Sequence, residues 1–465
     1  MTLSKKIVNS IVRITAQTIK YNLSLPFIPG EVGDSVGTGF FINDEGVILT
    51  CYHNIEHFIS IWVTIPLTGK TKYTCSVLGV YPGLDIALLK VHGYHNTSFL
   101  KLGNSDTIVA GETVYAIGYP LNSANIKMSQ GIVSGRNDGK IQTDTPLNPG
   151  NSGGPLLKNN KVIGINFQVA NGKNDVKIQN IGYSIPINSY KNIENSLLIK
   201  KGRTYKENVV VYKPSFGIYY NTVVPELQTL LGCPKHVKGL YVRKVVPTSS
   251  LYNTELKEGD ILSAIDDYDL DNFGLTNVSW NMEKESFNSL INNRFKQGDI
   301  ISITFWNSRE KKINKIKHTI QSVNEVHRIL PLIYPFNPIK YVCFGGITVM
   351  ELTIDHILSN EFSSLKWILE KELTYKRFLI ITEILPGSYI HKFGVFESGD
   401  CIVSLNGEKV NSLKKYRKKC LTLIKNCVTE QKKSICKQHF FILKTLSKKK
   451  VAMNLKEIIK GEHFL

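Results

Sequence analysis

Short apolar runs separated by turn residues fill the first 190 residues of the chain. The runs are rich in Val, Ile and Tyr, and Asn, Gly or Pro residues stand between them. Many short strands at such close spacing are typical of an all-β sandwich or barrel. A helical stretch at residues 189–200, followed by a polar and basic segment, marks the end of this first domain, predicted at residues 1–200. The predicted strands are Gly37–Ile42, Gly46–Thr50, Ile61–Ile65, Ile86–Val91, Thr113–Ile117, Gly131–Ser134 and Val162–Phe167.

The remainder of the chain contains an internal repeat. A Gly-Asp pair precedes an alternating apolar strand at Gly259–Asp260 and again, 140 positions later, at Gly399–Asp400. In both copies the glycine is expected to open a tight turn that the aspartate caps. A length of 465 residues fits about three domains of roughly 150 residues each. The sequence therefore predicts two related modules, at residues 208–325 and 335–460.

Positive charge is concentrated at the C-terminal end. The chain carries a net charge of +19, and residues 401–465 contain 16 Lys and Arg against 4 Asp and Glu. Such a segment can attract nucleic acid, anionic lipid or an acidic protein. A solvated lysine-rich face is the interpretation that we favour, because no aromatic–basic recognition motif accompanies the charge.

The sequence also predicts a location in the cytoplasm or nucleus. No stretch approaches the ~18 uninterrupted apolar residues of a membrane helix, so no membrane span is expected, and residues 1–17 lack the apolar core of a signal peptide. The eight cysteines show no framework spacing and are expected to be free thiols. A metal site at Cys420, Cys427, Cys436 and His439 is conceivable, but its spacing fits no familiar pattern. We expect neither a metal nor a cofactor.

The segment Asn148-Pro-Gly-Asn-Ser152-Gly-Gly-Pro-Leu156 carries the strongest chemical signal. Acyl transfer needs a serine hydroxyl exposed on a tight turn, with backbone N–H groups directed at the oxyanion. Glycines on both sides permit the required backbone conformation. Ser152 is therefore the candidate nucleophile, and the backbone of Gly150, Asn151 and Ser152 is the candidate oxyanion hole. The alternative is a glycine-rich turn without catalytic function.

A serine nucleophile needs a base, and the first domain offers four histidines. His53 follows an apolar strand directly and is the favoured candidate, whereas His57, four residues on, competes with it. His92 and His95 lie in a polar, turn-like stretch that suits solvated loop positions better.

The imidazole in turn needs a carboxylate to fix its tautomer and stabilise its charged form. Asp85 begins the apolar strand Ile86–Leu89, where an unpartnered charge would be costly to bury. Its alternative role, taken alone, is that of a turn cap. Together with His53 and Ser152, it completes a candidate triad.

These segments resemble the Deg/HtrA (Do-like) serine proteases, and the order His, Asp, Ser matches the chymotrypsin-type fold. The arrangement looks more like the plant and other eukaryotic Do-like proteases than the bacterial periplasmic ones. The segments that carry the resemblance are Gly37–Ile42, Leu49–His53, Asp85–Leu89, Gly118–Pro120, Gly131–Ser134, the Ser152 motif and Ile181–Pro186.

The resemblance implies a mostly β protein, in which a trypsin-like double β-barrel is followed by two PDZ-like α+β domains. His53 and Asp85 would come from the first barrel and Ser152 from the second. It further implies a serine endopeptidase that cleaves unfolded or damaged proteins and assembles into homo-oligomers based on trimers. A protease-fold chaperone or binding scaffold is the alternative function, and a nucleic-acid scaffold that uses the basic C-terminus is a weaker one.

Peptide capture is expected in the first PDZ-like module. The segment Lys213-Pro-Ser-Phe216-Gly217-Ile218 looks like a carboxylate-binding loop and first strand, to whose edge a C-terminal peptide would add. An ordinary strand entry is the alternative. In the second module, Phe344–Ile347 corresponds to this segment, and an insertion at 363–375 is expected to be helical.

Two further expectations concern activation and specificity. Asn151 stands where zymogen-type trypsins carry an aspartate that pairs with a new N-terminus, so activation is expected to depend on loop ordering through assembly or PDZ occupancy. Thr145, Pro146, Leu147 and Ile165 place no acidic group at an obvious pocket base. We therefore expect cleavage after small or medium apolar side chains.

Overall fold

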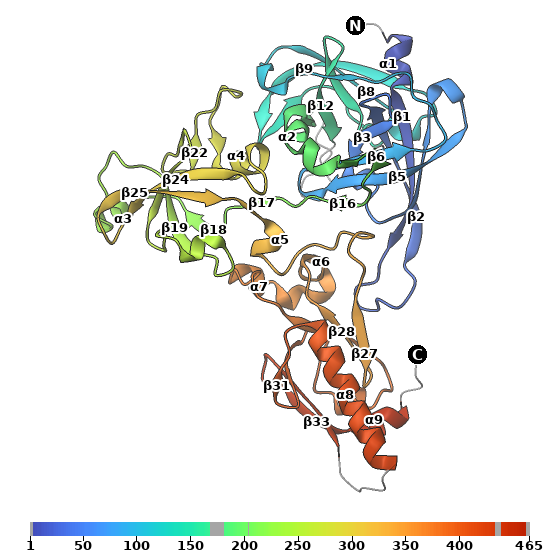
Figure 1. The fold of residues 1–465 in the computed structure, drawn as a ribbon, viewed down its shortest axis with the longest axis vertical. Coiled ribbons are helices and arrows are strands. Elements are labelled where there is room, and N and C mark those ends of the chain that lie inside the picture. The colour runs from blue at the N-terminus through green and yellow to red at the C-terminus, as the bar shows by residue number, and fades with distance from the viewer. Residues whose placement is uncertain (1–2, 168–180, 203, 433–438, 462–465) are drawn as a thin grey trace. The chain divides into compact units, whose positions relative to one another are not determined.

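The computed structural model describes residues 3–167, 181–202, 204–432 and 439–461. These residues form two compact units: Met1–Thr18 with Val32–Val326, and Ile19–Glu31 with His327–Leu465. The first unit contains the predicted barrel domain together with the first repeat module, and the second contains the second module (Figure 1). Among the described residues, no helix combines the length and apolar character that crossing a bilayer requires.

The first barrel closes through six strands in the order β5-β4-β1-β2-β3-β6, with β6 returning to β5. β3 is buried along its whole length because both of its faces are covered, whereas β4 alternates between more and less buried residues. A short helix α1 (Lys5–Asn9) precedes the barrel. The strands are β1 (Ile11–Lys20), β2 (Glu31–Phe41), β3 (Val47–Cys51), β4 (Phe58–Thr64), β5 (Lys72–Tyr81) and β6 (Ile86–Val91).

The second barrel closes in the order β11-β8-β9-β10-β13-β12, with β12 pairing back to β11. One cluster of buried side chains joins the two barrels, with Leu49 and Leu88 from the first and Ile117 and Ile165 from the second. This shared core packs the two barrels against each other. The strands are β8 (Thr113–Gly118), β9 (Lys127–Asn137), β10 (Lys140–Thr143), β11 (Pro155–Lys158), β12 (Lys161–Phe167) and β13 (Gly182–Pro186), followed by helix α2 (Ile187–Leu197).

The barrel domain extends beyond the predicted boundary at residue 200. Strand β16 (Val209–Val210) pairs in parallel with β5 of the first barrel, so the segment after α2 still contributes to its sheet. Conversely, residues 19–31, which run from the end of β1 to the start of β2, cluster with the second unit, where the rings of Tyr21 and Tyr334 lie 4.4 Å apart.

The first module is a sheet in the order β18-β19-β20-β24-β25, with β18 at its edge. Helix α4 (Phe287–Arg294) contributes Phe287, Leu290 and Ile291 to its core. In the same unit, the Arg294 guanidinium forms a bidentate ion pair with Asp106, with both distances 2.8 Å. The elements are β18 (Ile218–Asn221), α3 (Pro225–Leu230), β19 (Leu240–Val245), β20 (Ile261–Ile265), β21 (Tyr268–Asp269), β24 (Ile300–Asn307) and β25 (Lys312–Thr319).

The second module repeats this design in the order β27-β28-β29-β30-β32-β33. Helix α8 (Leu413–Lys432) lies along this sheet (Figure 1) and buries Tyr416, Cys420 and Cys427. The insertion expected to be helical contains only a 3-10 segment (Asn360–Leu365) and the single turn α7 (Trp367–Glu370). The other elements are β27 (Tyr341–Phe344), β28 (Ile347–Glu351), α6 (Ile354–Leu358), β29 (Leu379–Ile384), β30 (Cys401–Leu405), β31 (Glu408–Lys409), β32 (Phe440–Thr445), β33 (Lys450–Asn454) and α9 (Leu455–Gly461).

The internal repeat has the same hydrogen bonds in both modules. Gly259 and Gly399 both adopt a φ of +95°, which favours glycine. Oδ2 of Asp260 accepts the backbone N–H three residues before it at 2.8 Å, and so does Oδ2 of Asp400. Each carboxylate also pairs with a cation from the next hairpin, Asp260 with Arg309 and Asp400 with Lys449. The predicted role of the Gly-Asp pair as a capped turn is confirmed.

Short elements complete the described chain. They are β7 (Lys101–Leu102), β14 (Lys200–Lys201), β15 (Thr204–Tyr205), β17 (Pro214–Ser215), β22 (Leu275–Thr276), β23 (Glu285–Ser286), β26 (Gln321–Ser322) and α5 (Val323–Val326).

Candidate active site

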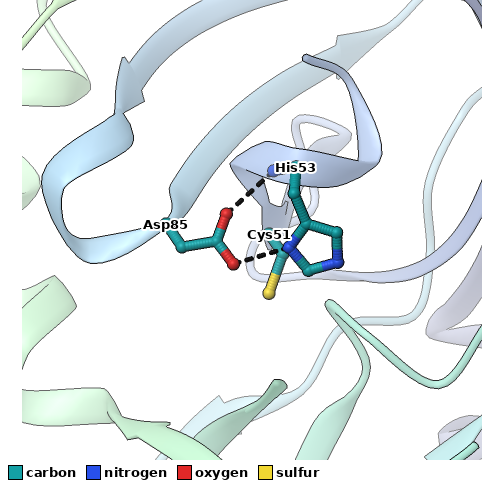
Figure 2. A group of neighbouring side chains, drawn as sticks. All are labelled: Cys51, His53 and Asp85. Carbon is teal, nitrogen blue, oxygen red and sulfur yellow. Dashed lines mark hydrogen bonds and ion pairs between the residues drawn. The ribbon is translucent and has the colours of Figure 1, made fainter. Parts of the chain in front are cut away.

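His53 and Asp85 meet because they follow the ends of two neighbouring strands. β3 and β6 are antiparallel, with Cys51 opposite Ile86. The chain leaves β3 in a 3-10 turn that carries His53, and it enters β6 directly after Asp85. As a result, Nδ1 of His53 lies 2.6 Å from Oδ2 of Asp85 (Figure 2).

Asp85 is held in place by backbone contacts as well. Its Oδ1 accepts the backbone N–H of His53 at 2.8 Å, and its carbonyl oxygen accepts the N–H of Tyr52 at 3.1 Å. Its backbone is left-handed, with φ 57° and ψ 44°, a conformation that aspartate tolerates better than most residues. The carboxylate therefore orients both the imidazole ring and the turn that carries it.

The electrostatic environment favours the protonated form of His53. Burial alone lowers its pKa, but the hydrogen bond and the negative charge of Asp85 outweigh burial, so the pKa is raised above its ordinary value. The imidazole is still partly accessible, with 38% of its side-chain surface exposed. A base with these contacts can accept a proton and stabilise the resulting cation.

Ser152 lies in the glycine-rich turn between β10 and β11, where side chains would not fit. Gly150 and Gly153 have φ values of +97° and +84°. A Cβ at Gly150 would lie 2.2 Å from the carbonyl oxygen of Tyr119, and one at Gly153 would lie 2.2 Å from that of Thr38. These close approaches explain why the motif requires glycine on both sides of the serine.

Two polar residues of the first barrel hold this turn, and sequence reasoning missed both. The carbonyl oxygen of Ser152 accepts the backbone N–H of Thr38 at 3.0 Å and Nδ2 of Asn54 at 2.9 Å. The Thr38 hydroxyl donates to the carbonyl oxygen of Gly150 at 2.6 Å. Thr38 and Asn54 are both buried. Only their positions in the sequence could have indicated these roles. Thr38 lies between Gly37 and Gly39, and Asn54 directly follows His53.

The candidate oxyanion donors are only partly as expected. The backbone N–H of Asn151 donates to the carbonyl oxygen of Asn148 at 2.9 Å, so it is not available to a substrate in this conformation. Among the described residues, the N–H groups of Gly150 and Ser152 donate to no backbone acceptor. The Ser152 hydroxyl likewise makes no hydrogen bond to His53 within the described part of the chain.

The competing histidines lie elsewhere. Nε2 of His57 is 3.9 Å from Glu56, and Nε2 of His92 hydrogen bonds to the Ser76 hydroxyl at 3.0 Å. His95 is exposed. His53 alone among these four pairs with Asp85.

The predicted peptide-binding segment lies at the edge of the first module. Phe216 is buried and its ring meets that of Phe287 on α4 at 5.2 Å. Gly217 has a φ of +73°, and a Cβ there would lie 2.1 Å from the Ser249 hydroxyl. Ile218 begins β18 and pairs with Val245 on one side only.

Four cysteines of the described chain are free thiols, which form no disulfide. They are Cys51, Cys75, Cys233 and Cys401. Of the conceivable metal site on the last helix, Cys420 and Cys427 are buried in the module core, and Cys436 lies outside the described residues.

Known proteins resemble this chain in sequence and in fold. A family model described as a trypsin-like peptidase domain matches residues 37–165. A protein of Chlamydia trachomatis named probable periplasmic serine endoprotease DegP-like is 33% identical over 238 residues, which cover 49% of this chain and 45% of that protein. The putative protease Do-like 3, mitochondrial, of Arabidopsis thaliana is 26% identical over 439 residues, covering 91% of this chain and 73% of that protein. The chain spans less than half the length of the first bacterial relatives.

A solved structure shows the same fold. The HtrA-type protease AlgW with decapeptide has a TM-score of 0.50 and 24% identity, covering 68% of this chain and 96% of that chain. Together with the two closed six-stranded barrels, this likeness confirms the predicted trypsin-like double-barrel fold.

The predicted location in the cytoplasm or nucleus is wrong. The bacterial relatives are named periplasmic and the plant relative mitochondrial. The prediction relied on the character of the first residues, but residues 5–20 form helix α1 and strand β1 of the folded domain. Their composition therefore reflects barrel packing and gives no information about the compartment.

The chain therefore contains a trypsin-like peptidase domain at residues 37–165, and it resembles DegP-like and Do-like serine proteases in sequence and an HtrA-type protease in fold.

Proposed function

We propose that the chain is a serine endopeptidase in which Ser152 is the nucleophile and His53 the general base. Asp85 orients the base and stabilises its protonated form. The hydrogen-bonded pair of His53 and Asp85 carries this proposal. It is supported by Asn54, which directly follows His53 and binds the Ser152 carbonyl oxygen, so the base and the nucleophile turn are coupled.

Peptide hydrolysis then proceeds through an acyl-enzyme. Nε2 of His53 takes the hydroxyl proton as Ser152 Oγ attacks the peptide carbonyl, and Asp85 stabilises the imidazolium that forms. The N–H groups of Gly150 and Ser152 stabilise the oxyanion. His53 then gives its proton to the leaving amine, and water hydrolyses the acyl group by the same route. Because the Ser152 hydroxyl makes no hydrogen bond to His53 in the described part of the chain, substrate or assembly has to bring these two groups into hydrogen-bonding geometry.

An active-site probe tests this assignment directly. Purified wild-type protein should be labelled by a fluorophosphonate and should cleave unfolded casein, whereas Ser152→Ala should do neither. Ser129→Ala is the matched control, because Ser129 lies on β9 and its hydroxyl hydrogen bonds only to the Pro146 carbonyl oxygen among the described residues. Equal labelling of the wild type and Ser152→Ala would overturn the proposal.

We further propose that the first module is a PDZ domain that captures C-terminal peptides. β18 is an edge strand, so a peptide can add to the sheet there. The tight turn at Gly217 directs backbone N–H groups toward the terminal carboxylate, and α4 supplies Phe287 as the far wall. A peptide with a free C-terminus should bind at least tenfold more tightly than its amidated form, measured by fluorescence anisotropy. Equal affinity for both forms would exclude carboxylate recognition.

Unfolded polypeptides are the proposed substrates and a homo-oligomer the proposed assembly. Mass photometry at several protein concentrations tests the assembly, and a trimer or a multiple of it is expected. A protein that stays monomeric while it cleaves casein would contradict the oligomer but not the chemistry.

A further inference from the structure

A buried thiol lies against the His53–Asp85 pair, and the proposed protease mechanism does not use it. Cys51 is the last residue of β3 and has no exposed surface. Figure 2 shows its sulfur beneath Nδ1 of His53, on the same side as the Asp85 carboxylate. One ligand atom from each of the three residues lies within 4.8 Å of the others. The thiol donates a hydrogen bond to the carbonyl oxygen of Asn166, at 3.4 Å.

We propose that Cys51, His53 and Asp85 form an inhibitory Zn²⁺ site, whose occupation removes the general base of the proposed protease. A thiolate, an imidazole nitrogen and a carboxylate oxygen are all ligands that zinc prefers. Three protein ligands leave the fourth tetrahedral position to water. The thiolate also selects Zn²⁺ and Cd²⁺ over Mg²⁺ and Ca²⁺, which prefer oxygen ligands.

The distances allow such a site after a small movement. Zinc bonds of about 2.0–2.3 Å place the ligand atoms of a tetrahedral site roughly 3.3–3.7 Å apart. Nδ1 of His53 and Oδ2 of Asp85 are 2.6 Å apart, so these two atoms must separate by about 1 Å. Asp85 is fixed by backbone hydrogen bonds, but the His53 ring has 38% of its surface exposed, and besides Asp85 it meets the Phe167 ring edge-on at 6.2 Å. The ring can therefore move, and the ion can enter along its exposed edge.

Binding exchanges a thiol proton for the metal without any redox change. The Zn–S bond replaces the S–H bond of Cys51, and that proton leaves to water. The Zn–N bond uses the lone pair of Nδ1 of His53, and the proton that Nδ1 carried moves to Nε2, so the ring stays neutral. The two anionic ligands balance the charge of Zn²⁺, which permits an ion at a buried position. With Nδ1 bound to zinc and Nε2 protonated, His53 has no free nitrogen lone pair and can no longer accept the proton of Ser152.

Cd²⁺ binding to the full chain gives a readout that does not depend on proteolysis. In the Ser152→Ala background, addition of Cd²⁺ should produce the ultraviolet thiolate-to-metal charge-transfer band, and Cys51→Ala should abolish it. Cys401→Ala is the matched control, since Cys401 is also a buried free thiol, and it should retain the band. His53→Ala, at a partly exposed position, is a second variant that should weaken Cd²⁺ binding at least about tenfold.

Inhibition of proteolysis gives the second readout. Zn²⁺ should inhibit the wild type reversibly on addition of a chelator, and Cys51→Ser and Cys51→Ala should need at least about tenfold more Zn²⁺ for half inhibition. A Cys51-dependent band in a protein without protease activity would support the metal site and reject the proposed function. A band that persists in Cys51→Ala, the absence of any band, or equal inhibition of wild type and Cys51 variants would overturn the metal site.

Discussion

A single carboxylate binds His53 twice: Oδ2 of Asp85 lies 2.6 Å from Nδ1 of the ring, and Oδ1 accepts the backbone N–H of the same residue at 2.8 Å. Asp85, directly before β6, therefore holds both the ring and the backbone of His53 in place. Because this orientation is complete without Ser152, the histidine half of the site is formed before the serine half closes.

Asp85→Asn should lower kcat about 10⁴-fold, as loss of this carboxylate does in a trypsin-like triad. The amide preserves the size of the side chain, but its NH₂ group favours the wrong histidine tautomer. Steady-state cleavage of a peptide substrate measures the effect. Asp138→Asn is the matched control, because Asp138 is exposed and also has a positive φ. A kcat within a few fold of wild type for Asp85→Asn would contradict the assigned role.

The pH profile should report the raised pKa of His53. The base must be neutral to accept the serine proton, so kcat/KM should fall as the pH decreases through a value above about 6.5, the ordinary histidine pKa.

The contribution of the same pKa shift to the free energy of unfolding has the opposite pH dependence. A raised folded-state pKa gives stability that is present below about 6.5 and is lost as the pH rises through the folded value. His53→Ala should therefore destabilise the protein more at pH 5.5 than at pH 8.5, as measured by chemical denaturation, and a pH-independent difference would argue against the pair.

Gly153→Ala should inactivate the protein and destabilise it by about 1–3 kcal/mol or more. Its φ of +84° disfavours a side chain, and the added Cβ would meet the Thr38 carbonyl oxygen at 2.2 Å. Gly111→Ala separates these two effects, since Gly111 has a φ of +87° but no atom within 4 Å of an added Cβ. Thermal unfolding and fluorophosphonate labelling should show a larger loss for Gly153→Ala than for Gly111→Ala.

Sequence alone predicts the parts of the candidate site that depend on local patterns. Gly150 and Gly153 signal a strained turn around Ser152, and the position of Asp85 at a strand start signals a buried charge that needs a partner. The Gly-Asp repeat also predicted a shared turn, because its hydrogen bonds are made within three residues.

Contacts between distant segments could not be predicted in this way. Thr38 and Gly150 are 112 residues apart, and Asn54 and Ser152 are 98 apart, so nothing in either local pattern signals the hydrogen bond between them. The same limit applies to the N–H of Asn151, whose engagement with Asn148 depends on the conformation of the turn. The compartment was misjudged for a related reason, since the first residues are part of a barrel strand.

Asn54→Ala should lower kcat with little change in KM. Removal of Nδ2 takes one donor from the buried Ser152 carbonyl oxygen and leaves it the N–H of Thr38, which costs about 1–3 kcal/mol. Asn54 touches no reacting atom in the proposed mechanism, so it acts as a positioning residue. The pH profile of kcat/KM should keep its acid limb, because the His53–Asp85 pair is intact. A shifted acid limb, or a change confined to KM, would show that Asn54 acts otherwise.

Acidification should loosen the first module through His318. This histidine lies on β25 with 5% of its surface exposed, and its ring is 6.0 Å from that of Phe216. Burial lowers its pKa to about 4, and among the described residues its Nε2 has no hydrogen-bond partner. A lowered folded-state pKa means that stability is present above about 6.5 and is lost as the pH falls toward 4, by at most about 3 kcal/mol.

Hydrogen–deuterium exchange of β25, corrected for intrinsic rates, should therefore accelerate between pH 6.5 and 4.5 in the wild type. His318→Asn should flatten this dependence, whereas His95→Asn at an exposed position should leave it unchanged. The same acceleration in His318→Asn would assign the effect to another group.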